Sequence, residues 1–185
     1  LQSSSVISSV YVSTDSNAIA KLARLYGAQV VMRPSNLSDD TASSESAILH
    51  AIETIRDSGT NPTSVVFAQC TSPFIEPSDV DGIIDLLNTF DSALTVTDNH
   101  SFIWRQSSDG SATGINHEPT VRLPRQMLPK EFRETGALYA FNVAGFEKNK
   151  HANFYTDCTN MSRRYFCVTL YINKQYYRNL VASNK

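Results

Sequence analysis

The chain has 185 residues, of which 41% are hydrophobic and 18% charged, and its formal net charge is -2. This length and composition fit a soluble globular protein with a substantial core and exclude a disordered chain. The near balance of acidic and basic residues argues against a general nucleic-acid-binding protein, and no apolar run reaches membrane-spanning length, so we expect neither nucleic acid nor membrane as a partner.

Strands and helices alternate through the first half of the chain, as judged from the spacing of its apolar residues. The expected strands cover residues 10–13, 28–32, 65–68 and 92–97, and the expected helices cover about 17–26, 45–56 and 80–90. Such alternation predicts an α/β fold with a Rossmann-like, mostly parallel sheet and helices on both of its faces.

Polar residues and glycine mark the ends of the first two expected helices. Asp15 or Ser16 can cap the first helix, and Ser43 or Ser44 the second, by accepting hydrogen bonds from free backbone N–H groups. Gly27 follows the first helix, where a glycine commonly ends a helix. The expected buried stripe of the second helix consists of Ala47, Ile48, Ala51, Ile52 and Ile55.

The pattern changes after the fourth expected strand. Residues 107–114 form a loop rich in Ser and Gly, flanked by strand-like runs at about 102–105 and 120–123. These runs predict a hairpin excursion from the main sheet over about residues 98–123. Residues 137–142 then return to a buried strand.

The last part of the chain, after about Lys150, is rich in Tyr, Asn, Lys and Arg. Residues 165–172 are an expected strand and residues 174–181 an expected short helix. Because there is no internal repeat and no clear linker, we expect one domain over residues 1–185.

The three cysteines are an odd number without the spacing of a metal site, namely Cys70, Cys158 and Cys167. They predict free thiols in a reducing compartment, which favours a cytoplasmic protein. The four histidines do not form a ligand set either, and the chain has no dinucleotide-binding, P-loop, serine-hydrolase or paired-cysteine motif. The common functions of those motifs are therefore excluded.

Two polar segments follow expected strands at the sheet edge where α/β proteins bind ligands. Residues 33–44 read Arg-Pro-Ser-Asn-Leu-Ser-Asp-Asp-Thr-Ala-Ser-Ser, and residues 69–73 read Gln-Cys-Thr-Ser-Pro. Arg33 is either a surface ion-pair partner or a ligand of a base or ribose. Gln69 either binds a sugar hydroxyl or amide, or bonds the loop backbone. Small polar loops that carry an arginine would suit a nucleotide.

A stretch of cations braced by prolines precedes the strand expected at residues 137–142. Its cationic residues are Arg122, Arg125, Lys130 and Arg133. Pro124 and Pro129 stiffen this stretch by fixing φ, and arginine binds carboxylate or phosphate through two parallel hydrogen bonds. Anion recognition and a solvated basic loop are about equally supported.

Seven short motifs occur in order along the chain, and together they resemble the N-acylneuraminate cytidylyltransferase (CMP-sialic acid synthetase) family. They are Val-Ser-Thr-Asp at 12–15, Gly-Ala-Gln-Val-Val at 27–31, Arg-Pro-x-x-Leu-x-x-Asp-Thr-Ala-Ser-Ser at 33–44, Gln-x-Thr-Ser-Pro at 69–73, His-x-Phe-x-Trp at 100–104, Pro-Arg-Gln-x-Leu-Pro-x-x-Phe-Arg at 124–133 and Gly-Ala-Leu-Tyr at 136–139. The resemblance covers about residues 1–150, and residues 151–185 form a divergent tail.

The resemblance implies a nucleotidyltransferase that joins a sialic-acid-like sugar to CTP, with Mg²⁺, forming the CMP-sugar and pyrophosphate. It assigns cytidine contacts to Arg33, Ala42 and Ser44. It assigns sugar-acid contacts to Gln69, Arg125, Arg133 and Tyr139. The segment Thr71-Ser72-Pro73 favours the sialic-acid branch over related Kdo enzymes, and the excursion at about 98–123 resembles the family's homodimer contact.

Some parts of the family pattern are not found in this sequence. The triphosphate loop Arg-x-x-Ser-Lys, followed by Lys-Asn, is absent, and the late magnesium-binding Asp-x-Asp is represented only by Asp157. Thr135 stands where the family usually has Asn. Because phosphoryl transfer depends on charge neutralisation at the reacting phosphates, we expect a truncated or altered member with impaired catalysis and no assigned catalytic residue.

Two alternative functions stay open at this point. One is a non-catalytic module, derived from the same fold, that binds a sugar acid or a nucleotide. The other is a nucleotidyltransferase for a different sugar acid, such as a legionaminate-like or pseudaminate-like compound, because such specificities differ by single polar contacts.

Overall fold

The structure is a computed structural model that describes residues 1–39, 41–121, 123–149 and 170–171. The described residues form two compact units, one from residues 1–96 and 135–185 and the other from residues 97–134. The division falls within two long strands, β4 (Ser92–Asn99) and β7 (Glu131–Asn142). The single domain expected over residues 1–185 stays a prediction.

The first unit contains a parallel sheet with the strand order β2-β1-β8. β1 (Tyr11–Thr14) pairs with β2 (Gln29–Met32) on one side and with β8 (Leu170–Tyr171) on the other. The intervening helix α1 (Asn17–Leu25) buries Ile19 and other apolar residues against β1. This strand-helix-strand unit confirms the expected alternation at the start of the chain.

A second sheet in this unit has the strand order β3-β7-β4. β3 (Ser64–Ala68) pairs antiparallel with β7, so that Phe67 lies opposite Tyr139. Parallel and antiparallel pairs therefore occur together in this α/β fold. The apolar run in β3 predicts burial, but it carries no information on the direction of the neighbouring strand.

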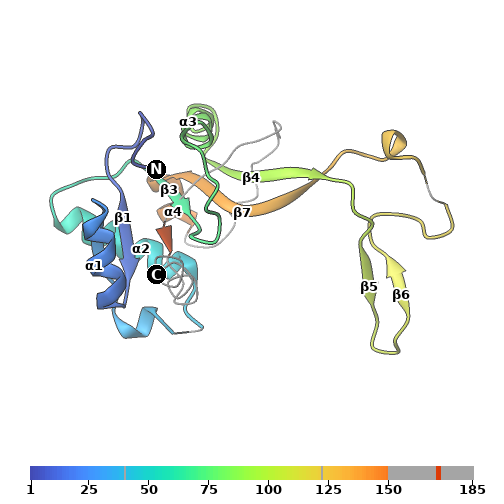
Figure 1. Cartoon of the computed structure of the whole chain (residues 1–185), viewed down its shortest axis with the longest axis horizontal. Coiled ribbons are helices and arrows are strands. Elements are labelled where there is room, and N and C mark those ends of the chain that lie inside the picture. The colour runs from blue at the N-terminus through green and yellow to red at the C-terminus, as the bar shows by residue number, and fades with distance from the viewer. Residues whose placement is uncertain (40, 122, 150–169, 172–185) are drawn as a thin grey trace, which may run out of the picture. The chain divides into compact units, whose positions relative to one another are not determined.

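Helices cover both faces of the β3-β7-β4 sheet, as expected (Figure 1). On one face, α2 (Ser44–Asp57) packs Ile48 and Ile52 against Phe67 and Phe141. On the other face, α3 (Pro77–Leu86) packs Ile83 against Ala68 of β3 and against Leu138 and Ala140 of β7. The two-residue side-chain period of a strand explains why each strand serves both cores.

The ends of the helices follow from local hydrogen bonds. Ser43 caps α2, because its side chain accepts a 3.2 Å hydrogen bond from Ser46 N. The helix α3 begins at Pro77, earlier than expected, because proline fits the first helical position and the Asp79 side chain accepts a 3.0 Å hydrogen bond from Glu76 N. All five residues of the stripe expected on α2 are buried.

A last described helix, α4 (Val143–Asn149), follows β7 directly. Glu147 on α4 forms a two-pronged ion pair with Arg56 near the end of α2, and one of its bonds joins Arg56 Nη2 to Glu147 Oε2 over 3.1 Å. This ion pair links α2 to α4, and the two helices also contribute to the same core cluster, through Ile48 and Phe146.

The second unit contains the expected hairpin excursion, formed by β5 (Trp104–Gln106) and β6 (Ala112–Gly114). The prediction that residues 120–123 form the second strand of the hairpin is wrong. The chain already reverses at residues 107–111, because Gly110 adopts a φ of +84° and the Asp109 side chain accepts a 2.9 Å hydrogen bond from Ser111 N.

Several expectations fall on residues that the structure does not describe. Of the strand expected at 165–172, residues 170–171 form β8, and the rest lies outside the described residues, as does the helix expected at 174–181. Arg122, Asp157, Cys158 and Cys167 also lie outside them. Within the described part of the chain, no helix combines the length and apolar character that a membrane span needs.

Candidate functional site

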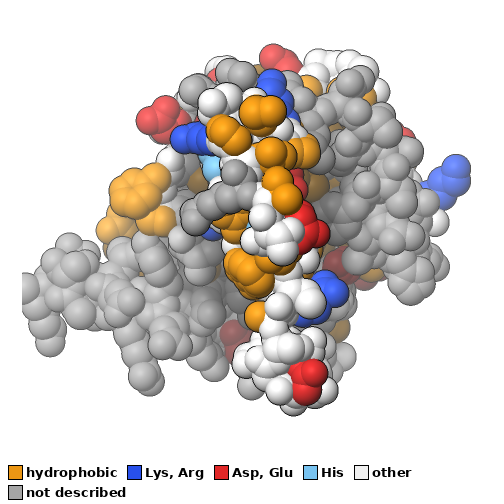
Figure 2. Space-filling view, turned by 90° about the vertical axis from the view of Figure 1, so that its right-hand side faces the viewer, with side chains coloured by type: hydrophobic (Ala, Val, Ile, Leu, Met, Phe, Trp, Pro, Cys, Tyr) orange, Lys and Arg blue, Asp and Glu red, His pale blue; other side chains and the backbone are white. Residues whose placement is uncertain are grey.

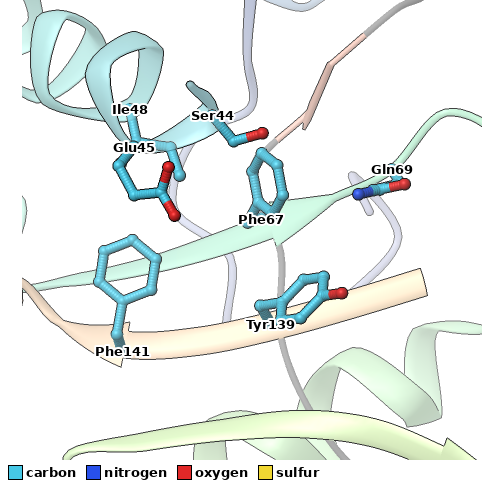
Figure 3. Close-up of a pocket in the computed structure, with 7 residues that line it drawn as sticks. All are labelled: Ser44, Glu45, Ile48, Phe67, Gln69, Tyr139 and Phe141. Carbon is cyan, nitrogen blue, oxygen red and sulfur yellow. The ribbon is translucent and has the colours of Figure 1, made fainter. Parts of the chain in front are cut away.

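A cavity of about 140 Å³ lies in the first unit, between the start of α2 and the strands β3 and β7 (Figure 3). Its lining residues are Ser44, Glu45, Ile48, Phe67, Gln69, Tyr139 and Phe141. The cavity lies at the carboxyl end of β3, which is the edge where the sequence predicts a ligand site.

The pairing of β3 with β7 positions the floor of the cavity. Phe67 lies opposite Tyr139, and their ring centroids are 5.7 Å apart with the ring planes at 49°. Gln69 extends the pairing beyond β3, because its backbone N–H donates a 3.1 Å hydrogen bond to Ala137 O. Strand alternation then places Phe67 and Gln69 on the same face, and both side chains line the cavity.

The start of α2 supplies the opposite wall, which contains Ser44 and Glu45. A tight turn precedes this helix: Asp39 Oδ1 accepts hydrogen bonds from Thr41 Oγ1 (2.7 Å) and Thr41 N (2.8 Å). Both bonds lower the pKa of the Asp39 carboxyl, and the bond from the Thr41 side chain has the larger effect. Ala42 N also donates to Asp39 O over 3.3 Å, so the turn fixes the path of the chain into α2.

Arg33 lies at the end of β2 and is buried, with 7% of its surface exposed. Its Nε donates a 3.1 Å hydrogen bond to Ser38 Oγ, and that hydroxyl donates a 2.9 Å hydrogen bond to Pro34 O. The Arg33 side chain thus bonds the loop that leads toward α2. Both interpretations of Arg33, as an ion-pair partner or as a ligand contact, stay predictions.

The structure brings together three of the seven predicted ligand contacts, since Ser44, Gln69 and Tyr139 line one cavity. Arg33 and Ala42 belong to the same unit but are not among the lining residues. Arg125 begins a 3₁₀ turn (Arg125–Met127) and Arg133 lies on β7; both are exposed and belong to the second unit. The roles of these residues in ligand binding stay predictions.

Four lining residues were not predicted as part of a site, namely Glu45, Ile48, Phe67 and Phe141. Ile48 and Phe67 belong to apolar patterns that predict core, and strand alternation from Gln69 was the signal that could have identified Phe67. Glu45 has an ordinary structural explanation, because acidic residues are common in the first turn of a helix, where they complement the helix dipole. Nothing in the sequence pattern points to its place in the cavity.

The described residues offer no ready magnesium site. Among them, no group of three or more His, Cys, Asp or Glu side chains is placed to hold a metal ion. The dependence on Mg²⁺ implied by the family resemblance stays a prediction.

The cytidylyltransferase family model matches residues 1–180 of the chain. The chain belongs to the cytidylyltransferase family. The match extends past residue 150, beyond the part of the chain in which the sequence motifs resemble the family.

Curated relatives of this chain include N-acylneuraminate cytidylyltransferase A of Danio rerio, which is 33% identical over 144 residues. These residues cover 74% of this chain and 32% of the relative. The N-acylneuraminate cytidylyltransferase of Oncorhynchus mykiss is 31% identical over 76% of this chain and 33% of the relative. That of Escherichia coli is 28% identical over 80% and 35%, respectively. The chain thus spans about a third of the length of the curated relatives it matches.

Solved structures confirm the fold. A CMP:2-keto-3-deoxy-manno-octonic acid synthetase in complex with CTP aligns with a TM-score of 0.55 at 12% identity, covering 100% of this chain and 85% of that one. A 4-diphosphocytidyl-2C-methyl-D-erythritol synthase from Anaerococcus prevotii aligns with a TM-score of 0.52 at 13% identity, covering 99% and 80%. Both neighbours share the α/β fold of this chain.

Proposed function

We propose that this chain transfers CMP from CTP to a sialic-acid-type nine-carbon sugar acid and releases pyrophosphate. The observation that carries the proposal is the meeting of Ser44, Gln69 and Tyr139, from three distant segments, at one cavity. The curated relatives named N-acylneuraminate cytidylyltransferase support the choice of sugar acid. In this reaction the anomeric 2-hydroxyl attacks the α-phosphate of CTP in line with the departing pyrophosphate.

The cavity chemistry suits part of a sugar. The Gln69 amide and the Tyr139 hydroxyl can each donate and accept a hydrogen bond, and both residues line the cavity together with Phe67 and Phe141. Polar groups on an apolar floor fix the orientation of a ligand and provide its specificity. In this proposal Gln69 and Tyr139 orient the sugar acid, and Ser44 contacts the cytidine.

The negative groups of the substrates need cations, and the proposal assigns the sugar carboxylate to Arg125 and Arg133. Both guanidinium groups are exposed, and arginine binds a carboxylate through paired hydrogen bonds.

A product assay tests this function. The chain is incubated with CTP, magnesium chloride and either N-acetylneuraminate or a legionaminate-type, pseudaminate-type or Kdo sugar acid, and CMP-sugar and pyrophosphate are quantified. We expect equal amounts of CMP-N-acetylneuraminate and pyrophosphate. If only another sugar acid is turned over, that acid would replace N-acetylneuraminate as the proposed substrate. Binding of CTP or the sugar acid without turnover would identify a non-catalytic binding module.

The proposal includes a homodimer formed through the second unit. Figure 2 shows hydrophobic side chains exposed on the face of the molecule that it draws. The exposed large apolar residues of this unit are Ile103, Trp104, Ile115, Val121, Leu123 and Met127. A two-stranded hairpin gains little stability alone, and exposed apolar patches mark interaction surfaces. In the proposed dimer, a second copy of the chain therefore covers these apolar residues.

Sedimentation equilibrium tests the dimer. We expect the wild-type chain to sediment with twice its monomer mass and Met127→Asp to sediment as a monomer. Leu25→Asp is the matched control, because Leu25 is an exposed apolar residue of the first unit. A wild-type monomer, or a dimer unchanged by Met127→Asp, would contradict this interface.

A further inference from the structure

We propose that Glu45 selects the ligand by accepting a hydrogen bond from an uncharged, donor-bearing substituent of the sugar acid, and that it keeps anionic groups out of the cavity. This inference rests on the proposed function and assigns a role to a residue that neither the motifs nor the relatives' names identify. In this arrangement the neutral end of the sugar acid, which bears hydroxyl or amide groups, lies inside the cavity, and its carboxylate end lies outside.

The first argument is the charge of the cavity wall. Among the described residues that line the cavity, Glu45 is the charged one, and the others are Ser44, Gln69, Tyr139 and apolar residues. An ionised carboxylate offers acceptors and no donors. It therefore favours hydroxyl, amide N–H or amine groups at close range and disfavours a carboxylate or phosphate.

The second argument is the position of the Glu45 side chain. Glu45 lies in the first turn of α2, and this turn forms one wall of the cavity. Figure 3 shows its carboxylate pointing from α2 toward the strands, with Gln69 near the other end of the cavity. A ligand group lying over Phe67 can thus meet an acceptor from α2 and the amide of Gln69.

The third argument is size. The cavity of about 140 Å³ is smaller than the roughly 300–1,000 Å³ of ordinary small-molecule pockets. It suits one substituent of a nine-carbon sugar acid, not the whole molecule with its carboxylate. The hydroxyl-bearing chain and the acylamino group of N-acetylneuraminate are uncharged donors of this kind.

Isothermal titration of the full chain tests the inference with N-acetylneuraminate and, separately, with CTP. We expect Glu45→Ala to weaken N-acetylneuraminate binding by roughly 10- to 100-fold, as the loss of a hydrogen bond to a charged group does, and to leave CTP binding unchanged. Glu45→Gln, which keeps the shape of the side chain, should show a smaller loss. The matched control Glu53→Gln removes an exposed charge from the same helix and should bind as the wild type does.

Derivatives of N-acetylneuraminate that each lack one hydroxyl group, or the N-acetyl group, identify the donor. We expect one derivative to bind wild type and Glu45→Ala equally, because its missing group is the partner of Glu45. Equal or tighter binding of N-acetylneuraminate by Glu45→Ala, or a loss confined to CTP, would overturn the inference while leaving the proposed function standing. A wild-type chain that binds neither CTP nor any sugar acid would instead remove the proposed function, and this inference with it.

Discussion

Phe67 and Tyr139 lie directly opposite each other on the antiparallel strands β3 and β7, with their ring centroids 5.7 Å apart. This cross-strand pair stabilises the sheet and also forms part of the cavity wall. The ring of Tyr139 therefore contributes to packing, and the proposed function gives its hydroxyl a separate role in ligand binding.

Tyr139→Phe separates these two roles. Because the ring is kept, we expect the melting temperature to change by no more than about 2 °C, which is the scale of a few tenths of a kcal/mol. The loss of one neutral hydrogen bond should weaken N-acetylneuraminate binding by about 2- to 12-fold. Tyr11→Phe makes the same chemical change on β1, away from the cavity lining, and should not alter binding. An unchanged affinity in Tyr139→Phe would remove the hydroxyl from the site.

Ser43→Ala tests the cap of α2. Ser43 Oγ accepts the hydrogen bond from Ser46 N, and loss of such a cap costs about 1 kcal/mol. We expect the free energy of unfolding in urea to fall by about this amount, while Ser43→Asp, which can also accept the bond, should stay close to wild type. Equal stability of Ser43→Ala and Ser43→Asp would show that the cap is not what fixes the helix start.

Arg125→Ala and Arg133→Ala test the predicted carboxylate contacts in the second unit. Each should raise the KM for the sugar acid by about tenfold or more, because a charge-assisted hydrogen bond is lost, and should change the KM for CTP much less. Arg24→Ala removes an exposed arginine from the last turn of α1 and serves as the control. Equal effects on the two KM values would count against a role at the sugar.

The ion pair between Arg56 and Glu147 predicts a dependence of stability on pH. The hydrogen bond from Arg56 is the main cause that lowers the pKa of Glu147. The pair therefore stabilises the fold fully above the unfolded-state pKa of roughly 4.3, and this contribution is lost as the pH falls through the lower folded-state pKa.

The effect should be small, because each side chain of the pair is 36% exposed and solvent screens such pairs. We expect thermal melts to show a lower melting temperature for Glu147→Gln than for wild type at pH 7, and a smaller difference at pH 3. Asp57→Asn is the matched control at the end of α2, because Asp57 is an exposed acid of that helix. A difference that grows as the pH falls would contradict this account.

The periodicity of the sequence predicts α2 well, because the burial of a helix face is recorded in its spacing. Every residue of the expected stripe is buried, and Ser43 is one of the two expected caps. The antiparallel direction of β7 could not be predicted in the same way. An apolar strand reports that it is covered, whereas its direction depends on pairing with a distant segment.

The hairpin of the second unit shows a different limit of the sequence. Val121 and Leu123 give residues 120–123 a strand-like pattern, yet both side chains are exposed. The true second strand, Ala112–Gly114, is too short and too polar to stand out, and the turn at Gly110 sets its place. In the cavity, the motif residues were found from the resemblance, but Glu45 was missed because an acid in the first turn of a helix has an ordinary structural explanation.

The central claim is that the cavity between α2, β3 and β7 holds the uncharged end of the sugar acid, and the most direct test is the kinetics of Gln69→Ala in CMP-sugar formation. We predict a KM for N-acetylneuraminate at least about fivefold above wild type, the scale of one lost hydrogen bond, with the KM for CTP unchanged. A wild-type KM for the sugar acid, or an increase confined to CTP, would contradict the assignment of this cavity.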